Sequence, residues 1–203
     1  MKAILTGDIV NSREEHPHIW MPALKEILNQ FGETPKVWEI FRGDMFQLQI
    51  SAKESLTAAL KIKARIRMLN NLDVRISIGI GKVEYQGTSI SESNGEAFIL
   101  SGECFEQLKR KKLAIKTPWQ EFNEEWNLYL KLASLTTDNW APKTAETFLT
   151  AINKPDSTQK EISNILNITQ STVSENLKRS GYYQFEDMIN RFIHKINNLE
   201  VQC

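Results

Sequence analysis

Two kinds of apolar pattern alternate along the first 117 residues. Short continuous or period-two runs are typical of strands, and apolar residues three and four positions apart are typical of helices. The first pattern predicts strands over residues 2–6, 37–41, 45–50, 74–80 and 113–117. The second predicts helices over residues 18–31, 51–70 and 97–112. The order βαββαβ, then αβ, predicts an α+β fold with a helix-backed, largely antiparallel sheet of ferredoxin-like type.

The C-terminal part of the chain has no strand pattern. From Trp119 to Ala133 the apolar residues fall at helical spacing, and the remainder has the pattern of four short helices. We therefore predict two domains, an α/β domain over residues 1–135 and an all-α domain over residues 136–203.

Residues 157–179, STQKEISNILNITQSTVSENLKR, carry the sharpest local pattern. Thr158 and Glu161 have the spacing of a capping box, which predicts the start of a helix. A short turn follows, and Thr169 can cap a second helix. The segment resembles the bacterial helix-turn-helix pattern TQxEIAxxLxISQxxVSxxLxR over nearly its full length.

By this resemblance the second helix would enter the DNA major groove. The bases would be faced by Gln170, Ser171, Thr172 and Ser174, and the phosphates by Lys178 and Arg179. The alternative is a helical bundle that binds another protein. Residues 141–203 hold seven Lys+Arg and seven Asp+Glu. Specific DNA binding would therefore need a homodimer or a local basic face to supply the phosphate contacts.

Composition narrows the class of protein. The 203 residues include 25 Lys+Arg and 25 Asp+Glu, so the formal charge is zero and gives no global attraction to nucleic acid or an anionic membrane. No apolar run approaches the ~20 residues that a membrane span needs. The N-terminal residues lack the apolar centre of a signal peptide, and two cysteines make no disulfide framework. We expect a cytoplasmic protein with no membrane partner.

Two aspartates follow glycines near the expected end of the first strand and in the turn of the hairpin. In a βαββ sheet these places can lie side by side, so Asp8 and Asp44 could share a cation such as Mg²⁺ or Mn²⁺. Asn11, Ser12 and Arg13 could then donate to an anion. The alternative is two unrelated aspartates in turns, where Gly-Asp is common.

Several motifs of the first domain resemble a known family. GDIVNSR, FRGDMFQ, RISIGIG and SNGEAFILSG together are similar to the SatD-like family of bacterial proteins, and their order also resembles a divergent class III nucleotidyl cyclase palm. This resemblance implies that Asp8 and Asp44 are metal ligands. It implies a nucleotide or phosphate ligand near these motifs, at Ile9, Asn11, Ser12, Arg13, Arg42 and Gly43.

One departure from the cyclases limits what the resemblance implies about catalysis. The stretch Gly95 to Glu103 lacks the Asn and Arg that act on the ribose and the transition state in cyclases. We therefore assign no catalytic residue. The leading hypothesis is a DNA-binding transcription regulator whose first domain senses a ligand or forms a dimer. The alternatives are a metal-dependent nucleotide-binding or nucleotide-processing enzyme and a protein-interaction module.

Overall fold

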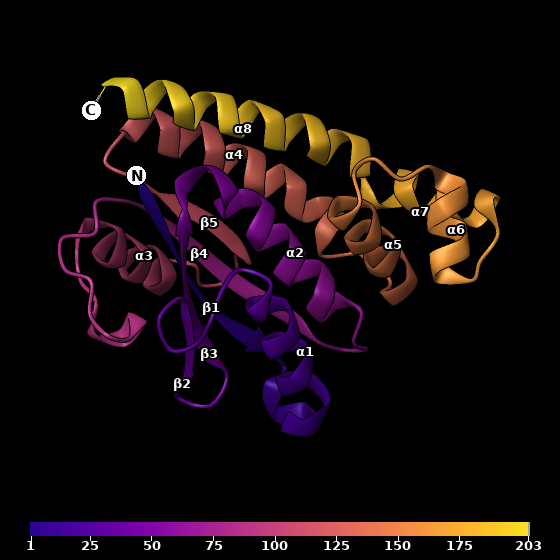
Figure 1. Cartoon of the computed structure of the whole chain (residues 1–203), viewed down its shortest axis with the longest axis horizontal. Helices are drawn as coiled ribbons and strands as arrows, with labels where there is room; N and C mark the ends of the chain where they lie inside the picture. The colour runs from indigo at the N-terminus through magenta and orange to yellow at the C-terminus, as the bar shows by residue number, and fades with distance from the viewer. Residues whose placement is uncertain (203) are drawn as a thin grey trace.

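The computed structural model describes residues 1–202 and shows a mixed α+β protein. Figure 1 shows a sheet with helices packed around it and a small helical group at one end. The strands are β1 (Lys2–Val10), β2 (Trp38–Phe41), β3 (Met45–Ser51), β4 (Asp73–Gly81) and β5 (Leu113–Lys116). The helices are α1 (Pro17–Asn29), α2 (Ser55–Arg67), α3 (Glu96–Gln107), α4 (Gln120–Thr137), α5 (Pro142–Asn153), α6 (Gln159–Leu166), α7 (Gln170–Ser180) and α8 (Tyr182–Gln202).

The five strands form one sheet in the order β2-β3-β1-β4-β5. β1 lies between β3 and β4 and is antiparallel to both, and β2 is antiparallel to β3. β5 joins β4 in parallel. The five expected strands are therefore confirmed, and the sheet is mixed.

The two faces of β1 pack against different helices. Ala3, Leu5 and Ile9 point into the main core with α1 and α2, as the period of two along a strand requires. The opposite face is covered by α3, whose backbone approaches Gly79 so closely that a Cβ there would lie 2.3 Å from the Ser101 nitrogen. Thr6 and Ser77 satisfy their polar groups on this face by hydrogen bonding with Ser101.

The main core continues into the C-terminal helices. α8 runs back alongside α4, and the Trp126 and Phe192 rings meet edge to face with centroids 4.8 Å apart. Trp140 is buried against Phe148 and Phe185, so α5 and the start of α8 belong to the same core. The predicted division after residue 135 falls inside the last turn of α4.

Several element boundaries differ from the sequence prediction. The helix predicted over residues 51–70 begins at Ser55, after a short 3-10 turn, and ends at Arg67. β1 continues to Val10 because Ile9 and Val10 keep pairing with β4. The helix predicted over residues 97–112 ends at Gln107, and Lys109 takes a left-handed φ of 48° that starts a turn toward β5. The last helix is not short: α8 has 21 residues because its apolar side packs along α4.

Among residues 1–202, no helix has the length and apolar character required to cross a membrane.

Candidate functional site

A hollow of about 740 Å³ opens at the edge of the sheet where β1 ends and β4 begins. Its walls come from four segments: the end of β1 with the following turn, the β2–β3 hairpin, the start of β4, and the loop before β5. Seven of the eight predicted metal and phosphate residues line it, namely Asp8, Ile9, Asn11, Ser12, Arg13, Arg42 and Asp44.

Two of the predicted ligand residues present no side chain to this hollow. Gly43 does not line this hollow and lies instead at a separate depression, which it lines with Arg42 and Phe41. The Ile9 side chain is in the hydrophobic core with 2% exposure, so only its backbone is available to a ligand.

The register of the sheet pairs Asp8 with Arg75. Asp8 on β1 lies opposite Arg75 on β4, and both side chains emerge on the α3 face. The Arg75 Nε donates to one carboxylate oxygen at 2.9 Å, and an Nη donates to the other. This side-chain hydrogen bond raises the pKa of Arg75 further above its ordinary value. Both oxygens of Asp8 thus already have a cationic partner.

Asp44 is held by the turn that follows β1. The Ser12 hydroxyl donates to the Asp44 carboxylate, which links the β1 turn to the hairpin. Asn11 has a left-handed φ of 64°, which Asx residues tolerate, and its side-chain amide donates to the Asn71 carbonyl at 3.0 Å. The predicted neighbourhood of Asp8 and Asp44 is therefore present. Among residues 1–202, however, no group of three or more His, Cys, Asp or Glu side chains is placed to hold a metal ion.

The loop before β5 adds basic residues that were not among the predicted site residues. Arg75 donates through Nη1 to the Lys109 carbonyl at 3.3 Å, and the Ile76 amide donates to the Lys112 carbonyl at 2.8 Å. These bonds bring Lys109, Arg110 and Lys112 to the wall of the hollow. One sequence signal could have found Arg75: it is the one charged residue in the strand predicted over residues 74–80.

The hollow is lined by six basic and three acidic side chains. The basic ones are Arg13, Arg42, Arg75, Lys109, Arg110 and Lys112, and the acidic ones are Asp8, Glu14 and Asp44. This balance gives the hollow a positive potential in a protein whose net charge is zero.

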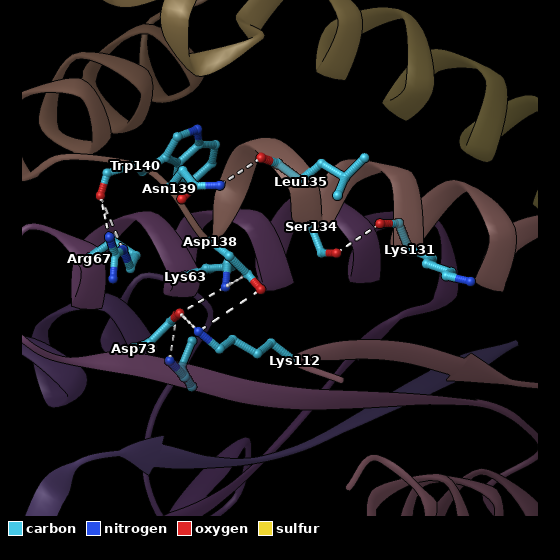
Figure 2. A network of polar contacts seen from close by, with 11 residues as sticks. Lys63, Arg67, Asp73, Lys112, Lys131, Ser134, Leu135, Asp138, Asn139 and Trp140 are labelled. Carbon is cyan, nitrogen blue, oxygen red and sulfur yellow. Dashed lines mark hydrogen bonds and ion pairs between the residues drawn. The ribbon is translucent and has the colours of Figure 1, made fainter. Parts of the chain in front are cut away.

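Lys112 connects the hollow to a buried ionic network, which Figure 2 shows. Its Nζ lies 2.5 Å from Asp73 and 3.9 Å from Asp138. Lys63 on α2 is fully buried and bonds the same two carboxylates, at 2.9 Å and 2.7 Å. Burial raises the pKa of Asp73, but the charge of Lys63 and the hydrogen bonds from Lys112, Lys63 and the Val74 amide outweigh it, so the pKa lies below its ordinary value.

The network continues toward α7 through the segment after α4. Asp138 immediately follows α4, and two residues later the Trp140 carbonyl accepts from Arg67 of α2 at 3.1 Å and 2.5 Å (Figure 2). The Trp140 indole N–H donates to the Ser180 carbonyl, at the last residue of α7, at 3.1 Å. Asp138, at the hollow's network, and Trp140, at the C-terminal end of α7, are therefore joined by the short stretch of backbone between them.

Helices α5, α6 and α7 form a compact unit at one end of the molecule (Figure 1). The predicted capping box is present: the Glu161 amide donates to the Thr158 hydroxyl at 3.3 Å, and the Thr158 amide to the Glu161 carboxylate at 2.7 Å. Asn167 ends α6 in a left-handed conformation, and the Thr169 hydroxyl caps α7 by accepting from the Thr172 amide. The two predicted helices and the short turn between them are therefore present, as α6 and α7.

The inner face of α7 is fastened to α5 and α6. Val173 and Leu177 pack against Ala151 and Ile162. Asn176 is buried and donates to the Thr147 hydroxyl of α5 at 3.1 Å. These contacts hold α7 with Val173, Asn176 and Leu177 turned toward α5 and α6.

The outer face of α7 carries all six residues that were predicted to contact DNA. Gln170, Ser171, Thr172, Ser174, Lys178 and Arg179 are exposed. Arg179 lies 3.4 Å from Glu175 one turn earlier, in a solvent-exposed pair that contributes little to stability. The described part of the chain leaves this face open, so it is available to a partner.

Comparison of this chain with protein-family models, with curated proteins and with solved structures found no match.

Proposed function

We propose that this protein is a transcription regulator that binds DNA through α7 and senses a ligand through its N-terminal α/β part. The observation that best supports DNA binding is the exposed polar face of α7. The opposite face of α7 is buried, and helix α6, which precedes it, packs against it. In this arrangement the polar N-terminal half of α7 supplies Gln170, Thr172 and Ser174 to base edges.

We propose a ferredoxin-like fold for the N-terminal α/β part. Strands β2-β3-β1-β4 follow the order of a ferredoxin-like βαββαβ sheet, to which β5 is added. The resemblance of the GDIVNSR and FRGDMFQ motifs to the SatD-like family and to the cyclase palm agrees with that order. The α5–α7 unit then serves as the helix-turn-helix domain.

Phosphate contacts come from the C-terminal end of α7, where Lys178 and Arg179 are exposed. Because the C-terminal part is neutral overall, two cations give one copy weak affinity. We therefore propose that a homodimer reads two half-sites, whose spacing follows from the separation of the two α7 helices.

The test is DNA selection with the full-length protein, followed by binding titrations at several salt concentrations. Thr172→Ala should relax base preference, and Lys178→Ala should weaken binding to all sequences and lower the salt slope by about 1. Lys53→Ala, an exposed lysine in the short turn before α2, is the matched charge control. If no sequence is enriched and neither α7 variant lowers affinity, DNA binding by α7 is wrong.

A second candidate function is metal-dependent nucleotide binding or processing, because Asp8 and Asp44 line one hollow. Mg²⁺ or Mn²⁺ would be the metal, and these carboxylates its ligands. The Arg75 pair with Asp8 opposes this candidate, since a metal would have to displace the guanidinium. Turnover of nucleoside triphosphates that requires Mn²⁺ or Mg²⁺ and is lost in Asp44→Asn would support the enzyme.

A further inference from the structure

The hollow at the end of β1 gathers cations from segments far apart in the sequence. Arg13 follows β1, Arg42 lies in the hairpin, and Lys109 and Arg110 lie in the loop before β5. All four are exposed, and within residues 1–201 none of them has a carboxylate oxygen within 4.0 Å of its charged group.

Specific contacts hold this arrangement in place. Arg75 fastens the 109–112 loop to the sheet through the Lys109 carbonyl, while its guanidinium is held by Asp8. Ser12 ties the β1 turn to the hairpin through Asp44. Cations placed together repel one another, and a multiply charged anion between them removes that repulsion.

We infer that the hollow binds a small molecule bearing a phosphate chain directly through arginine and lysine side chains, with no metal between them. The inference names the ligand class for the sensing role proposed above and rests on that role alone. It does not depend on DNA binding by α7, so the two proposals can fail separately.

The chemistry of the lining supports a phosphate chain. Guanidinium groups bind phosphate oxygens in a bidentate manner, and Arg13, Arg42 and Arg110 can each offer one. Lysine adds mobile point charges, here at Lys109. The volume of about 740 Å³ is that of a small-molecule site and exceeds what one inorganic phosphate fills.

Arg75 is the reason that no metal is needed. In a metal–phosphate site, carboxylates hold the cation that neutralises the phosphate. Here Arg75 occupies both oxygens of Asp8, so this carboxylate is already paired and does not hold a metal ion. The remaining basic side chains are then free to take the ligand's negative charge.

The experiment measures binding of inorganic pyrophosphate and tripolyphosphate to the full-length protein by calorimetry, in EDTA and separately in Mg²⁺ or Mn²⁺. We expect binding in EDTA, tighter for tripolyphosphate. The double variant Lys109→Ala/Arg110→Ala should weaken it by roughly tenfold or more. Both side chains are exposed, so the variant should melt as the wild type does without ligand. Lys53→Ala/Lys82→Ala, two exposed lysines elsewhere, is the matched control.

Three results would overturn the inference. The first is the absence of binding by either polyphosphate at millimolar concentration. The second is binding that needs Mg²⁺ or Mn²⁺ and is lost in Asp44→Asn, which would assign a metal site. The third is displacement of the polyphosphate by duplex DNA in the wild type and equally in a Lys178→Ala variant. This result would mean that the hollow binds a nucleic-acid backbone.

Discussion

Arg75 lies directly opposite Asp8 on the neighbouring strand, and its guanidinium holds both oxygens of that carboxylate. The same guanidinium also binds the Lys109 carbonyl and lies 5.7 Å from the centre of the Phe105 ring. One side chain thus neutralises the aspartate, orders the loop before β5 and packs on α3. The polar edge of the sheet is organised around this residue.

Removal of the Arg75 guanidinium should allow the hollow to bind a metal ion. In Arg75→Ala, Asp8 loses its cationic partner while Asp44 lines the same hollow, so Mg²⁺ should bind there. We expect a melting temperature that is lower than wild type and rises with added Mg²⁺, whereas the wild type shows no such rise. A thermal melt in EDTA and in millimolar Mg²⁺ measures this. An equal Mg²⁺ effect in both proteins would contradict the role assigned to Arg75.

Loss of the buried lysine should be the most damaging single change to the ionic network. Lys63 has no exposed surface, and Lys63→Ala leaves Asp73 buried with one cationic partner fewer. Breaking a buried pair on one side costs about 3–5 kcal/mol of unfolding free energy. Urea denaturation of the variant and of the exposed control Lys53→Ala measures the difference. A loss below about 1 kcal/mol would contradict a buried, paired Lys63.

The stability of the protein should fall in acid through Asp73. The pKa of Asp73 is lowered from 3.8 in the folded protein, so its contribution is present above the unfolded value and is lost as the pH falls through the folded value. We expect the free energy of unfolding to decrease as the pH is taken below about 4, and Asp73→Asn to flatten that dependence. Urea denaturation at a series of pH values from neutral into this acid range measures both slopes. Identical slopes for wild type and variant would contradict the prediction.

The link between Trp140 and α7 predicts coupling between the two proposed sites. Trp140→Phe keeps an aromatic ring in the core and removes the hydrogen bond to the Ser180 carbonyl, which contributes about 1 kcal/mol. The smaller ring also leaves a cavity, which adds to the loss of stability. If ligand binding acts through Lys112, Asp138 and Trp140, tripolyphosphate should change the DNA affinity of the wild type more than that of the variant. DNA titrations with and without tripolyphosphate give, for each protein, the ratio of the two dissociation constants for DNA. Equal ratios would exclude this route.

Cys104 should react slowly in the folded protein. Burial raises the pKa of its thiol to about 11, so the thiolate that attacks alkylating reagents is scarce at about pH 8. We expect iodoacetamide to modify Cys104 at least about tenfold more slowly in buffer than in urea. Peptide mapping by mass spectrometry follows this cysteine separately from Cys203. Equal rates would show that the site between α3 and β5 is open.

The sequence patterns of single segments were sufficient to predict the local secondary structure. The alternation in residues 74–80, the capping pair Thr158 and Glu161, and the turn before Thr169 depend on neighbours within a few positions, so the strand, helix α6 and the start of α7 follow from the sequence. The same holds for the outward residues of α7, because helical spacing places them opposite Val173 and Leu177.

The role of Asp8 depends on a contact that forms only in the folded chain. Its partner Arg75 is 67 positions away and meets it through the register of two antiparallel strands, which no local pattern specifies. The length of α8 was likewise underestimated, because it comes from packing along α4. Local periodicity and capping signals in the sequence were enough to predict the helices and strands and the exposed face of α7. The pairing of strands and the long-range burial of charge determined the cationic hollow, because those depend on residues that meet only in the folded chain.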